Sequence, residues 1–360
     1  MAGGFGERFW PLSRMKKPKQ ILKLTSDNLN MMQESISRIS EIISYDDIFI
    51  ITSELILEPI RNSVPEIPAQ NIIAEPIKRN TAPCLALAAS FIMAKYIDYD
   101  SSEIVMAVLT ADHKIEPKAE FQNNIVELLD FVYNNPSLAT IGIKPDRPDT
   151  GYGYIELGGN VSESVYSVNR FREKPDLETA ISFLQSGNFV WNSGMFFWRL
   201  DTFTDELIKN SPDIGKLIPE LKSCFEGFTN LALSSYKEGT KEIFELMPSI
   251  SIDYALMEKS GNVVCRKSDF RWDDVGSWDS LDRVRPSDNN KNILTGNVVL
   301  VDSTNSTILN ESNITVTGVG LENLVVIATD DSIMICPKEK AQDVKKIVNA
   351  LRDSNKVNLL

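Results

Sequence analysis

The feature that most constrains this chain is a glycine-rich stretch at its amino end, followed by clustered basic residues. Gly3, Gly4 and Gly6 leave backbone N–H groups uncovered, and turning amides of this kind form concave sites for anions. Arg8 and Lys19 stand close enough in sequence to neutralise a bound phosphate chain. This stretch therefore predicts a loop that holds a triphosphate. On the glycines alone, a surface turn with basic side chains is the alternative.

The basic character of this stretch is local. Residues 1–24 carry six basic side chains and one acidic one, whereas the chain of 360 residues has a formal net charge of −13. Nucleic acids and anionic membranes require a broad positive face, so we expect neither as a partner. The stretch fits neither GxxxxGK[ST] nor GxGxxG, since Phe9 stands where the second pattern has its last glycine.

The composition is that of a globular protein. Apolar residues make up 42% and charged residues 24%, with no apolar run of the roughly 20 residues that a membrane helix needs and no visible signal peptide. The four cysteines are widely separated and form no CxxC pair, which indicates reduced thiols and no zinc site. We expect a cytoplasmic protein, and the sequence leaves a homodimer open.

Apolar strands and helical patterns alternate through the first two hundred residues, which is typical of a parallel α/β fold. The predicted strands span 48–52, 104–109, 138–143, 152–157 and 165–171, and the predicted helices span 81–97, 121–133 and 177–186. Further on, the composition shifts toward Val, Thr, Asn and Gly, with strands predicted over 297–301, 313–316, 324–329 and 332–335 and a helix over 339–352. We expect a large domain over 1–285 and a small β-rich domain over 286–360, too short for its sequence to decide whether it is part of a β-helix.

A phosphate loop of this type normally follows a buried apolar strand that anchors it in the sheet. Here Gly3 is preceded by Met1 and Ala2. We expect either that the natural product begins several residues upstream, or that the sheet lacks a central strand and is less stable for it.

Two acidic motifs supply candidate metal ligands. Asp112 follows the strand predicted over 104–109, and ligands of open α/β sheets bind at the carboxyl ends of strands. Mg²⁺ binds one or two carboxylates together with phosphate oxygens, so Asp112 is the first candidate. The second motif, WDDVGSW over 272–278, contains Asp274. A helix cap or turn is the alternative role for either motif. His113, the sole histidine, is expected to be structural, which excludes a catalytic triad.

Together these motifs resemble the sugar-nucleotide pyrophosphorylases. GGxGxRxxPLSR over 3–14, followed by PKQ over 18–20, resembles the signature of that family, and the PLSR and PKQ variants resemble its mannose-1-phosphate guanylyltransferase branch. The resemblance continues in order through AEPxxRNTAP (74–83), GYGYI (151–155), FxEKPD (171–176), WNSGMF (191–196), SIDYALMEKS (251–260) and WxDVGSW (272–278).

The resemblance implies a Rossmann-like nucleotidyltransferase (GT-A-like) fold, an α/β architecture with a mixed sheet and a small β-rich C-terminal domain. It implies catalytic roles for Arg8, Lys19 and Asp112, and Mg²⁺ ligation by Asp112 and Asp274. The nucleotide-binding residues that it implies are Gly3, Gly4, Gly6, Glu75, Asn80 and Thr81. The implied sugar-phosphate contacts are Gly153, Glu173, Lys174 and Asn192.

Each of these segments also has a structural reading. Asn80 can cap the helix that follows it, the glycines of 151–155 suit a hairpin turn, and Glu-Lys before Pro is common on surfaces. We expect the aromatic residues of 191–198 to lie in the core and the segment 249–259 to be a packing helix.

The activity that the resemblance implies is Mg²⁺-dependent, in-line transfer of a guanylyl group from GTP to mannose 1-phosphate, giving GDP-mannose and pyrophosphate. Two alternatives stay open. One is a nucleotidyltransferase for another nucleotide or hexose 1-phosphate. The other is a non-catalytic homologue that binds GDP-mannose and regulates a partner enzyme.

Overall fold

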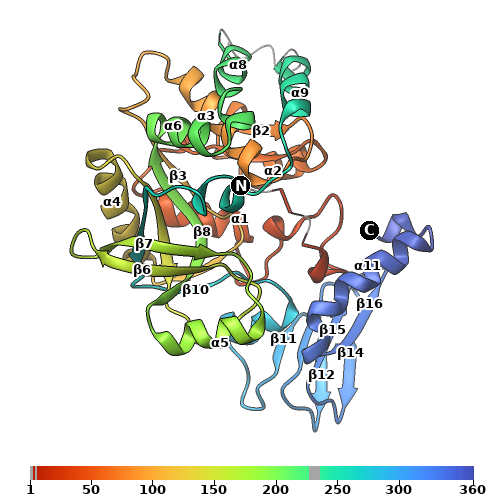
Figure 1. Ribbon diagram of the computed structural model, residues 1–360. Coiled ribbons are helices and arrows are strands. Elements are labelled where there is room, and N and C mark those ends of the chain that lie inside the picture. Colours follow the sequence, from red (N-terminus) through yellow and green to blue (C-terminus); the bar gives the residue numbers. More distant parts are fainter. Residues whose placement is uncertain (1–2, 5, 227–235) are drawn as a thin grey trace.

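The structure is a computed structural model that describes residues 3–4, 6–226 and 236–360, and Figure 1 shows a large α/β domain with a smaller β domain at its side. The strands of the large domain are β1 (Ile50–Ser53), β2 (Ile72–Glu75), β3 (Val105–Val108), β4 (Lys114–Glu116), β5 (Leu138–Ile143), β6 (Tyr154–Asn160), β7 (Val165–Arg172), β8 (Phe189–Arg199), β9 (Val263–Lys267) and β10 (Arg271–Asp273). Its helices are α1 (Met31–Ile39), α2 (Leu57–Ser63), α3 (Thr81–Lys95), α4 (Lys118–Asn134), α5 (Leu177–Ser186), α6 (Leu200–Asn210), α7 (Pro212–Gly215), α8 (Ile218–Ser223), α9 (Tyr236–Leu246) and α10 (Leu281–Val284). The small domain contains β11 (Ile293–Thr295), β12 (Val298–Val301), β13 (Thr307–Asn310), β14 (Val316–Val319), β15 (Leu324–Ala328), β16 (Ile333–Pro337) and α11 (Val344–Asp353).

The main sheet is mixed, with the strand order β3-β8-β5-β9-β7-β6. β5 and β9 run parallel, whereas β3, β5 and β6 all pair antiparallel with β8. The mixed sheet that the resemblance implied is confirmed, whereas the parallel pattern suggested by the alternation of strands and helices is wrong because it missed β8. This strand is buried along most of its length, so it shows no alternation of apolar and polar residues.

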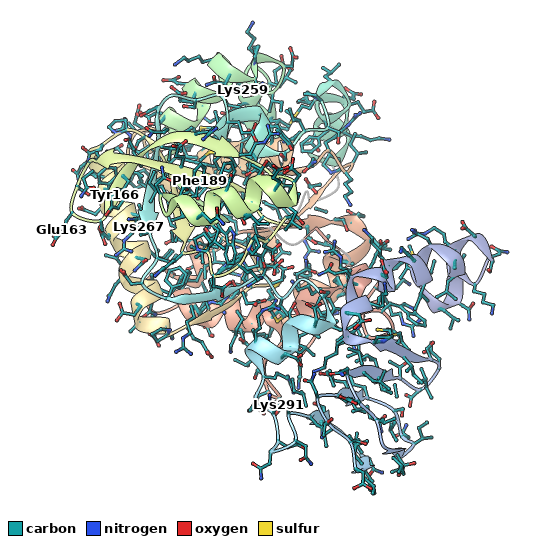
Figure 2. The ribbon with its side chains drawn as sticks, turned by 60° about the horizontal axis from the view of Figure 1, so that its bottom comes forward. Glu163, Tyr166, Phe189, Lys259, Lys267 and Lys291 are labelled. Carbon is teal, nitrogen blue, oxygen red and sulfur yellow. The ribbon has the colours of Figure 1, made fainter. Side chains whose placement is uncertain are left out.

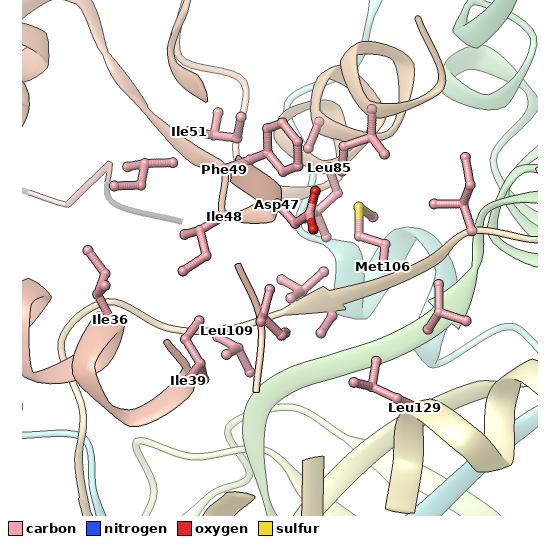
Figure 3. Close-up of a pocket in the computed structure, with 18 of the residues that line it drawn as sticks. Ile36, Ile39, Asp47, Ile48, Phe49, Ile51, Leu85, Met106, Leu109 and Leu129 are labelled. Carbon is pink, nitrogen blue, oxygen red and sulfur yellow. The ribbon is translucent and has the colours of Figure 1, made fainter. Parts of the chain in front are cut away.

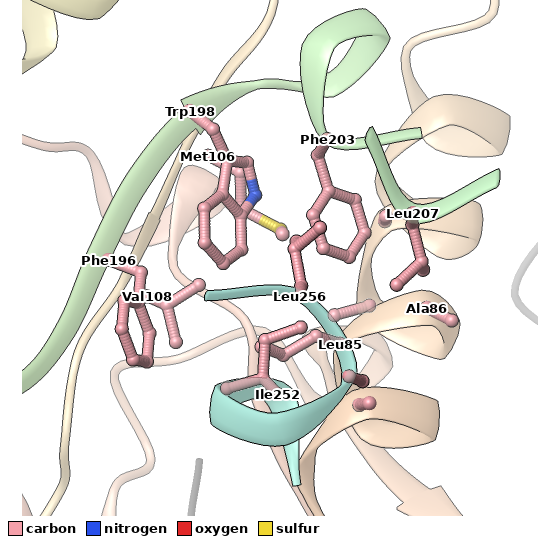
Figure 4. Close-up of a cluster of buried hydrophobic side chains, with 14 of the residues drawn as sticks. Leu85, Ala86, Met106, Val108, Phe196, Trp198, Phe203, Leu207, Ile252 and Leu256 are labelled. Atoms are coloured by element: carbon pink, nitrogen blue, oxygen red, sulfur yellow. The ribbon is translucent and has the colours of Figure 1, made fainter. Parts of the chain in front are cut away.

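Two apolar layers cover the two faces of this sheet. On one face α3, α6 and α8 pack on sheet residues such as Met106 and Trp198, and Trp198 stacks on Phe203 of α6 with ring centroids 4.7 Å apart (Figure 4). On the other face α1, α4 and α5 pack on residues that include Phe197. Each large side chain buried in this way contributes about 1.5–3 kcal/mol. The prediction that the aromatic residues of 191–198 belong to the core is confirmed.

Neighbouring strands also pair through an exposed lysine and a half-buried tyrosine. Tyr166 of β7 and Lys267 of β9 lie side by side in Figure 2, with the Lys267 Nζ 4.3 Å from the centre of the tyrosine ring. A cation over an aromatic face contributes about 0.5–1 kcal/mol when the cation, like Lys267, is exposed.

Parallel strands that repeat along the chain build the small domain. β12 pairs in parallel with β14, and β11, β13 and β15 pair in parallel with one another. Asn305 and Asn323, which are 18 residues apart, hydrogen-bond to each other as equivalent positions of successive coils. This is the geometry of a short β-helix. The strand predicted over 313–316 lies ahead of the observed β14, and no strand was predicted at β11 or β13. Strands of three or four residues are too short to show a clear alternation of apolar and polar residues.

The α/β sheet is interrupted between β1 and β3. β1 pairs in parallel with β2, β3 pairs with β8, and no strand of the described residues lies between their facing edges. A cavity of about 550 Å³ occupies this position, lined by apolar side chains that include Ile36, Ile51 and Met106 (Figure 3). The absence of a central strand stays a prediction, and this cavity is where such a strand would lie.

Filling this cavity is expected to stabilise the fold. We predict that an extended segment of about five Val and Ile residues, fused ahead of Met1, raises the melting temperature by several degrees. Each apolar side chain buried there contributes about 1.5–3 kcal/mol, against an ordering cost of about 1–2 kcal/mol per residue. The matched control is a Gly-Ser segment of equal length, and both fusions are measured by scanning calorimetry. Equal melting temperatures would show that the cavity does not accept a strand.

Candidate active site

The amino-terminal loop is packed directly on Lys19. Gly6 has a φ of 66°, and a Cβ built on it would lie 2.5 Å from the Lys19 Cβ. A side chain at this position would meet both a strained backbone and a steric clash, so glycine is required here. The hydroxyl of Ser13 donates to the Gly6 carbonyl over 2.7 Å and fixes the turn.

Lys19 joins this loop to the two predicted acidic motifs. Its side chain is buried, and its Nζ lies 3.1 Å from Asp112 Oδ2 and donates to the backbone carbonyl of Asp274 over 2.8 Å. Asp112 follows β3, and Asp274 follows β10. Because β10 pairs antiparallel with β4, the strand just after Asp112, two segments far apart in sequence are brought to one point.

The two carboxylates differ in their surroundings. Burial opposes ionisation of Asp112, yet the Lys19 ammonium holds its pKa below the ordinary value. Burial raises the pKa of Asp274, whose Oδ1 accepts a hydrogen bond from the Tyr152 hydroxyl over 2.7 Å. The charge of Asp112 raises the pKa of Asp274 further. A divalent cation would relieve this repulsion between carboxylates, so the donor set fits Mg²⁺. In the described part of the chain no three Asp, Glu, His or Cys residues cluster as a metal site, so protein ligation would rest on this pair.

Neighbouring residues of both motifs have structural roles. Asp273 accepts hydrogen bonds from Arg283 and from the backbone N–H of Val275. These bonds occupy its carboxylate, so Asp274 remains the candidate metal ligand of this motif. His113 contacts Thr110 and accepts a hydrogen bond from Trp272 over 3.0 Å. Burial lowers the pKa of His113 to about 4, so the ring is neutral at physiological pH.

A cavity of about 480 Å³ lies over these groups. Five of the predicted residues line it, namely Gly6, Arg8, Lys19, Asp112 and Asp274. Arg8 makes no ion pair with any residue that the structure describes, so its charge is available to a ligand. Lys78 and Lys345 also line the cavity and were not predicted. Lys78 lies within a recognised motif, whereas Lys345 belongs to the small domain and carries no sequence signal beyond its charge.

The remaining nucleotide candidates do not line this cavity. Glu75 ends β2, and its Oε2 is 3.8 Å from the Cβ position of Gly3. The Asn80 side chain accepts from the Thr81 N–H over 2.8 Å, and the Thr81 hydroxyl accepts from the Ile252 N–H over 2.8 Å. Asn80 and Thr81 therefore hold the start of α3, as the capping alternative predicted. Gly4 has open space around it, with its nearest neighbour 3.8 Å from the Cβ position.

Three of the four sugar-phosphate candidates meet at one point. A Cβ on Gly153 would lie 2.4 Å from Glu173 Oε2 and 3.3 Å from the Asn192 Cβ, so this glycine makes room for the glutamate. Lys174 ion-pairs with Glu173 over 2.8 Å and is largely exposed. Tyr152, which precedes Gly153, contacts Asp274 and thus connects this group with the carboxylate pair.

Asp253 belongs to the same group and was missed. Its Oδ1 accepts from the Asn192 side chain over 3.1 Å, and burial together with the charge of Glu173 raises its pKa to about 6. The segment around it was interpreted as a packing helix, which holds for the buried Ala255 and Leu256. The sequence signal that could have identified Asp253 was its position as a carboxylate near the start of the recognised motif SIDYALMEKS.

Comparisons with known proteins agree with this geometry. The model of the nucleotidyl transferase family matches residues 1–291, and that of the MannoseP isomerase/GMP-like beta-helix domain matches residues 296–351. A mannose-1-phosphate guanylyltransferase of Escherichia coli is 38% identical over 99% of this chain and 74% of its own length, and one of Klebsiella pneumoniae shares the same figures. The chain belongs to the nucleotidyl transferase family, in the branch of the mannose-1-phosphate guanylyltransferases.

A solved structure extends the likeness to both domains. The crystal structure of a mannose-1-phosphate geranyltransferase from Thermus thermophilus superposes with a TM-score of 0.85 at 27% identity, covering 98% of each chain. The match supports the mixed nucleotidyltransferase sheet with a β-rich C-terminal domain. The family model over 296–351 identifies the small domain as a β-helix, which the sequence had left open.

Two further expectations concern the chain as a whole. The four cysteines are free thiols, as predicted. Within the described ranges, no helix has both the length and the apolar character that crossing a bilayer requires.

Glu75 is expected to make stability depend on pH. Burial raises its pKa from 4.5 to about 7, so the folded state binds more protons than the unfolded chain between these values. The contribution of Glu75 to stability is fully present below pH 4.5 and is lost as pH rises through 7. We predict that Glu75→Gln gains stability relative to the parent protein from about pH 5 to about pH 8, by at most about 3 kcal/mol. Urea unfolding at the two pH values measures this. A constant difference between the two proteins would contradict it.

Proposed function

We propose that this chain catalyses the Mg²⁺-dependent transfer of a guanylyl group from GTP to mannose 1-phosphate. One observation carries the proposal: the glycine loop and both acidic motifs converge on Lys19 beneath a single cavity. Membership of the guanylyltransferase branch supports this choice of nucleotide and sugar. A cytoplasmic location belongs to the same proposal.

Mg²⁺ held by Asp112 and Asp274 would neutralise phosphate charge and draw the two anionic substrates together. Arg8 and Lys19 stabilise the charge that develops on the α-phosphate and on the leaving pyrophosphate. A phosphate oxygen of mannose 1-phosphate forms the new bond to the α-phosphorus, and the bond from that phosphorus to the bridging oxygen breaks. Pyrophosphate leaves with the electron pair. The attacking oxygen is already anionic, so the step requires no general base.

The group around Gly153 suits the sugar phosphate. Glu173 and Asn192 offer an acceptor and an amide to the hydroxyls of a hexose, and Lys174 offers a cation to its phosphate. Asp253 orients the Asn192 amide. We assign Glu75, Asn80 and Thr81, with Gly3 and Gly4, to the nucleotide side, where they shape the loop beside the base and ribose.

The test is pyrophosphate release by purified protein with Mg²⁺, mannose 1-phosphate and each of GTP, ATP, UTP and dTTP. GTP-dependent release is expected. Release with another nucleotide would identify a different specificity, and no release from folded protein would favour the non-catalytic alternative. Glucose 1-phosphate in place of the mannose ester tests the choice of sugar.

Asp112→Asn is expected to lower turnover at least about 100-fold while the protein stays folded, because it removes one of two carboxylates that charge neutralisation depends on. The matched control is Asp213→Asn, an exposed carboxylate on α7 that does not line the cavity. Initial rates and circular dichroism are measured for both variants. Undiminished turnover in Asp112→Asn would overturn the metal assignment.

A further inference from the structure

The last helix of the small domain lies against the phosphate loop of the large one (Figure 1). Val344 and Val348 of α11 are buried in one apolar cluster with Phe9 and Trp10. Arg352, at the far end of the helix, ion-pairs with Glu7 over 3.0 Å. The helix therefore has a fixed position relative to the loop.

Contacts on either side of α11 also hold it in place. The Gln342 side chain, just ahead of the helix, donates to the Ser277 hydroxyl over 2.7 Å. Beyond the helix, the Trp10 indole donates to the backbone carbonyl of Leu359 over 2.8 Å. Ser277 belongs to the second acidic motif and Trp10 to the loop, so α11 is tied to both parts of the candidate site.

This placement brings the side chain of Lys345 to the cavity. Lys345 lines it together with Gly6, Arg8, Lys19 and Asp112. The next residue, Lys346, pairs instead with the nearby Asp343 over 2.9 Å, and its side chain is 71% exposed. Of these two adjacent lysines, Lys345 therefore faces the cavity and Lys346 faces solvent.

The charges around the cavity leave a role for a further cation. Lys19 is engaged by Asp112, and the carboxylate of Glu7 is engaged by Arg352. A nucleoside triphosphate brings about four negative charges, more than one Mg²⁺ and Arg8 neutralise, and two further lysines, Lys78 and Lys345, line the cavity. A lysine ammonium is a mobile point charge that suits phosphate oxygens.

We propose that Lys345 binds the β- and γ-phosphates of the nucleotide, so that the β-helix domain supplies part of the substrate site. This inference rests on the proposed function. Lys345 is assigned to the pyrophosphate end because it shares the cavity with the loop residues Gly6 and Arg8, whereas Glu173, Lys174 and Asn192 do not line that cavity. The small domain then acts in substrate binding as well as in packing.

The experiment compares Lys345→Ala with Lys346→Ala, which removes the same charge one residue away. Lys345→Ala is expected to raise the KM for GTP and the Kd for Mg²⁺-pyrophosphate about five- to tenfold, with the KM for mannose 1-phosphate changed less than about twofold. Lys345→Arg is expected to restore binding. Lys346→Ala is expected to match the parent protein in all three constants, and both lysines are exposed, so neither substitution disturbs the core.

Calorimetric titration with Mg²⁺ and inorganic pyrophosphate separates this inference from the proposed function, because it requires no turnover. Weaker pyrophosphate binding in Lys345→Ala alone supports the role of Lys345 even if GTP is not the substrate. Equal pyrophosphate binding by the two alanine variants overturns that role, whether or not GTP is turned over. Absence of pyrophosphate binding in the parent protein overturns it as well.

Discussion

The buried ammonium of Lys19 is the interaction on which the candidate site depends. A charged group removed from water is tolerated when it is paired and hydrogen-bonded, and Lys19 meets this condition through Asp112 and the carbonyl of Asp274. The Cβ of Lys19 in turn leaves no room for a side chain on Gly6. The loop, the end of β3 and the segment after β10 are thereby held in one arrangement before any ligand arrives. Such preorganisation lowers the reorganisation that binding and reaction require.

The candidate site has two parts with different electrostatic character. Cations dominate around the glycine loop, where Arg8, Lys19 and Lys345 line the cavity. Carboxylates and an amide dominate around Gly153, where the pKa of Asp253 is raised by burial and by Glu173. The first set suits a polyphosphate and the second suits sugar hydroxyls. Tyr152 connects the two parts, since it precedes Gly153 and donates to Asp274. The position of the carboxylate pair between them suits a reaction in which both substrates meet there.

Short sequence motifs predicted local structure well, but they did not predict which residues distant in sequence are brought together by packing. The family, the turn at Gly6 and the position of Asp112 after a strand followed from short motifs, because glycine turns and strand-end carboxylates have local causes. Lys345 could not be found in this way, since only the packing of its amphipathic helix brings this exposed lysine to the cavity. Asp253 was missed for a different reason, because the motif that contains it was recognised but was interpreted as a packing helix. The long strand β8 escaped prediction because burial on both faces erases the period of two.

The packing of α11 also bears on how the loop is anchored. Loops of this type are held by the strand that precedes them, and between β1 and β3 no such strand is present among the described residues. The described residues hold the loop from its downstream side. Phe9 and Trp10 are buried against Trp278 and the small domain, and each such side chain contributes about 1.5–3 kcal/mol. Arg14 adds a hydrogen-bonded ion pair to Asp331 of the small domain at 2.6 Å. The β-helix domain therefore acts as a structural support for Gly6 and Arg8, which makes the geometry of the candidate site depend on both domains.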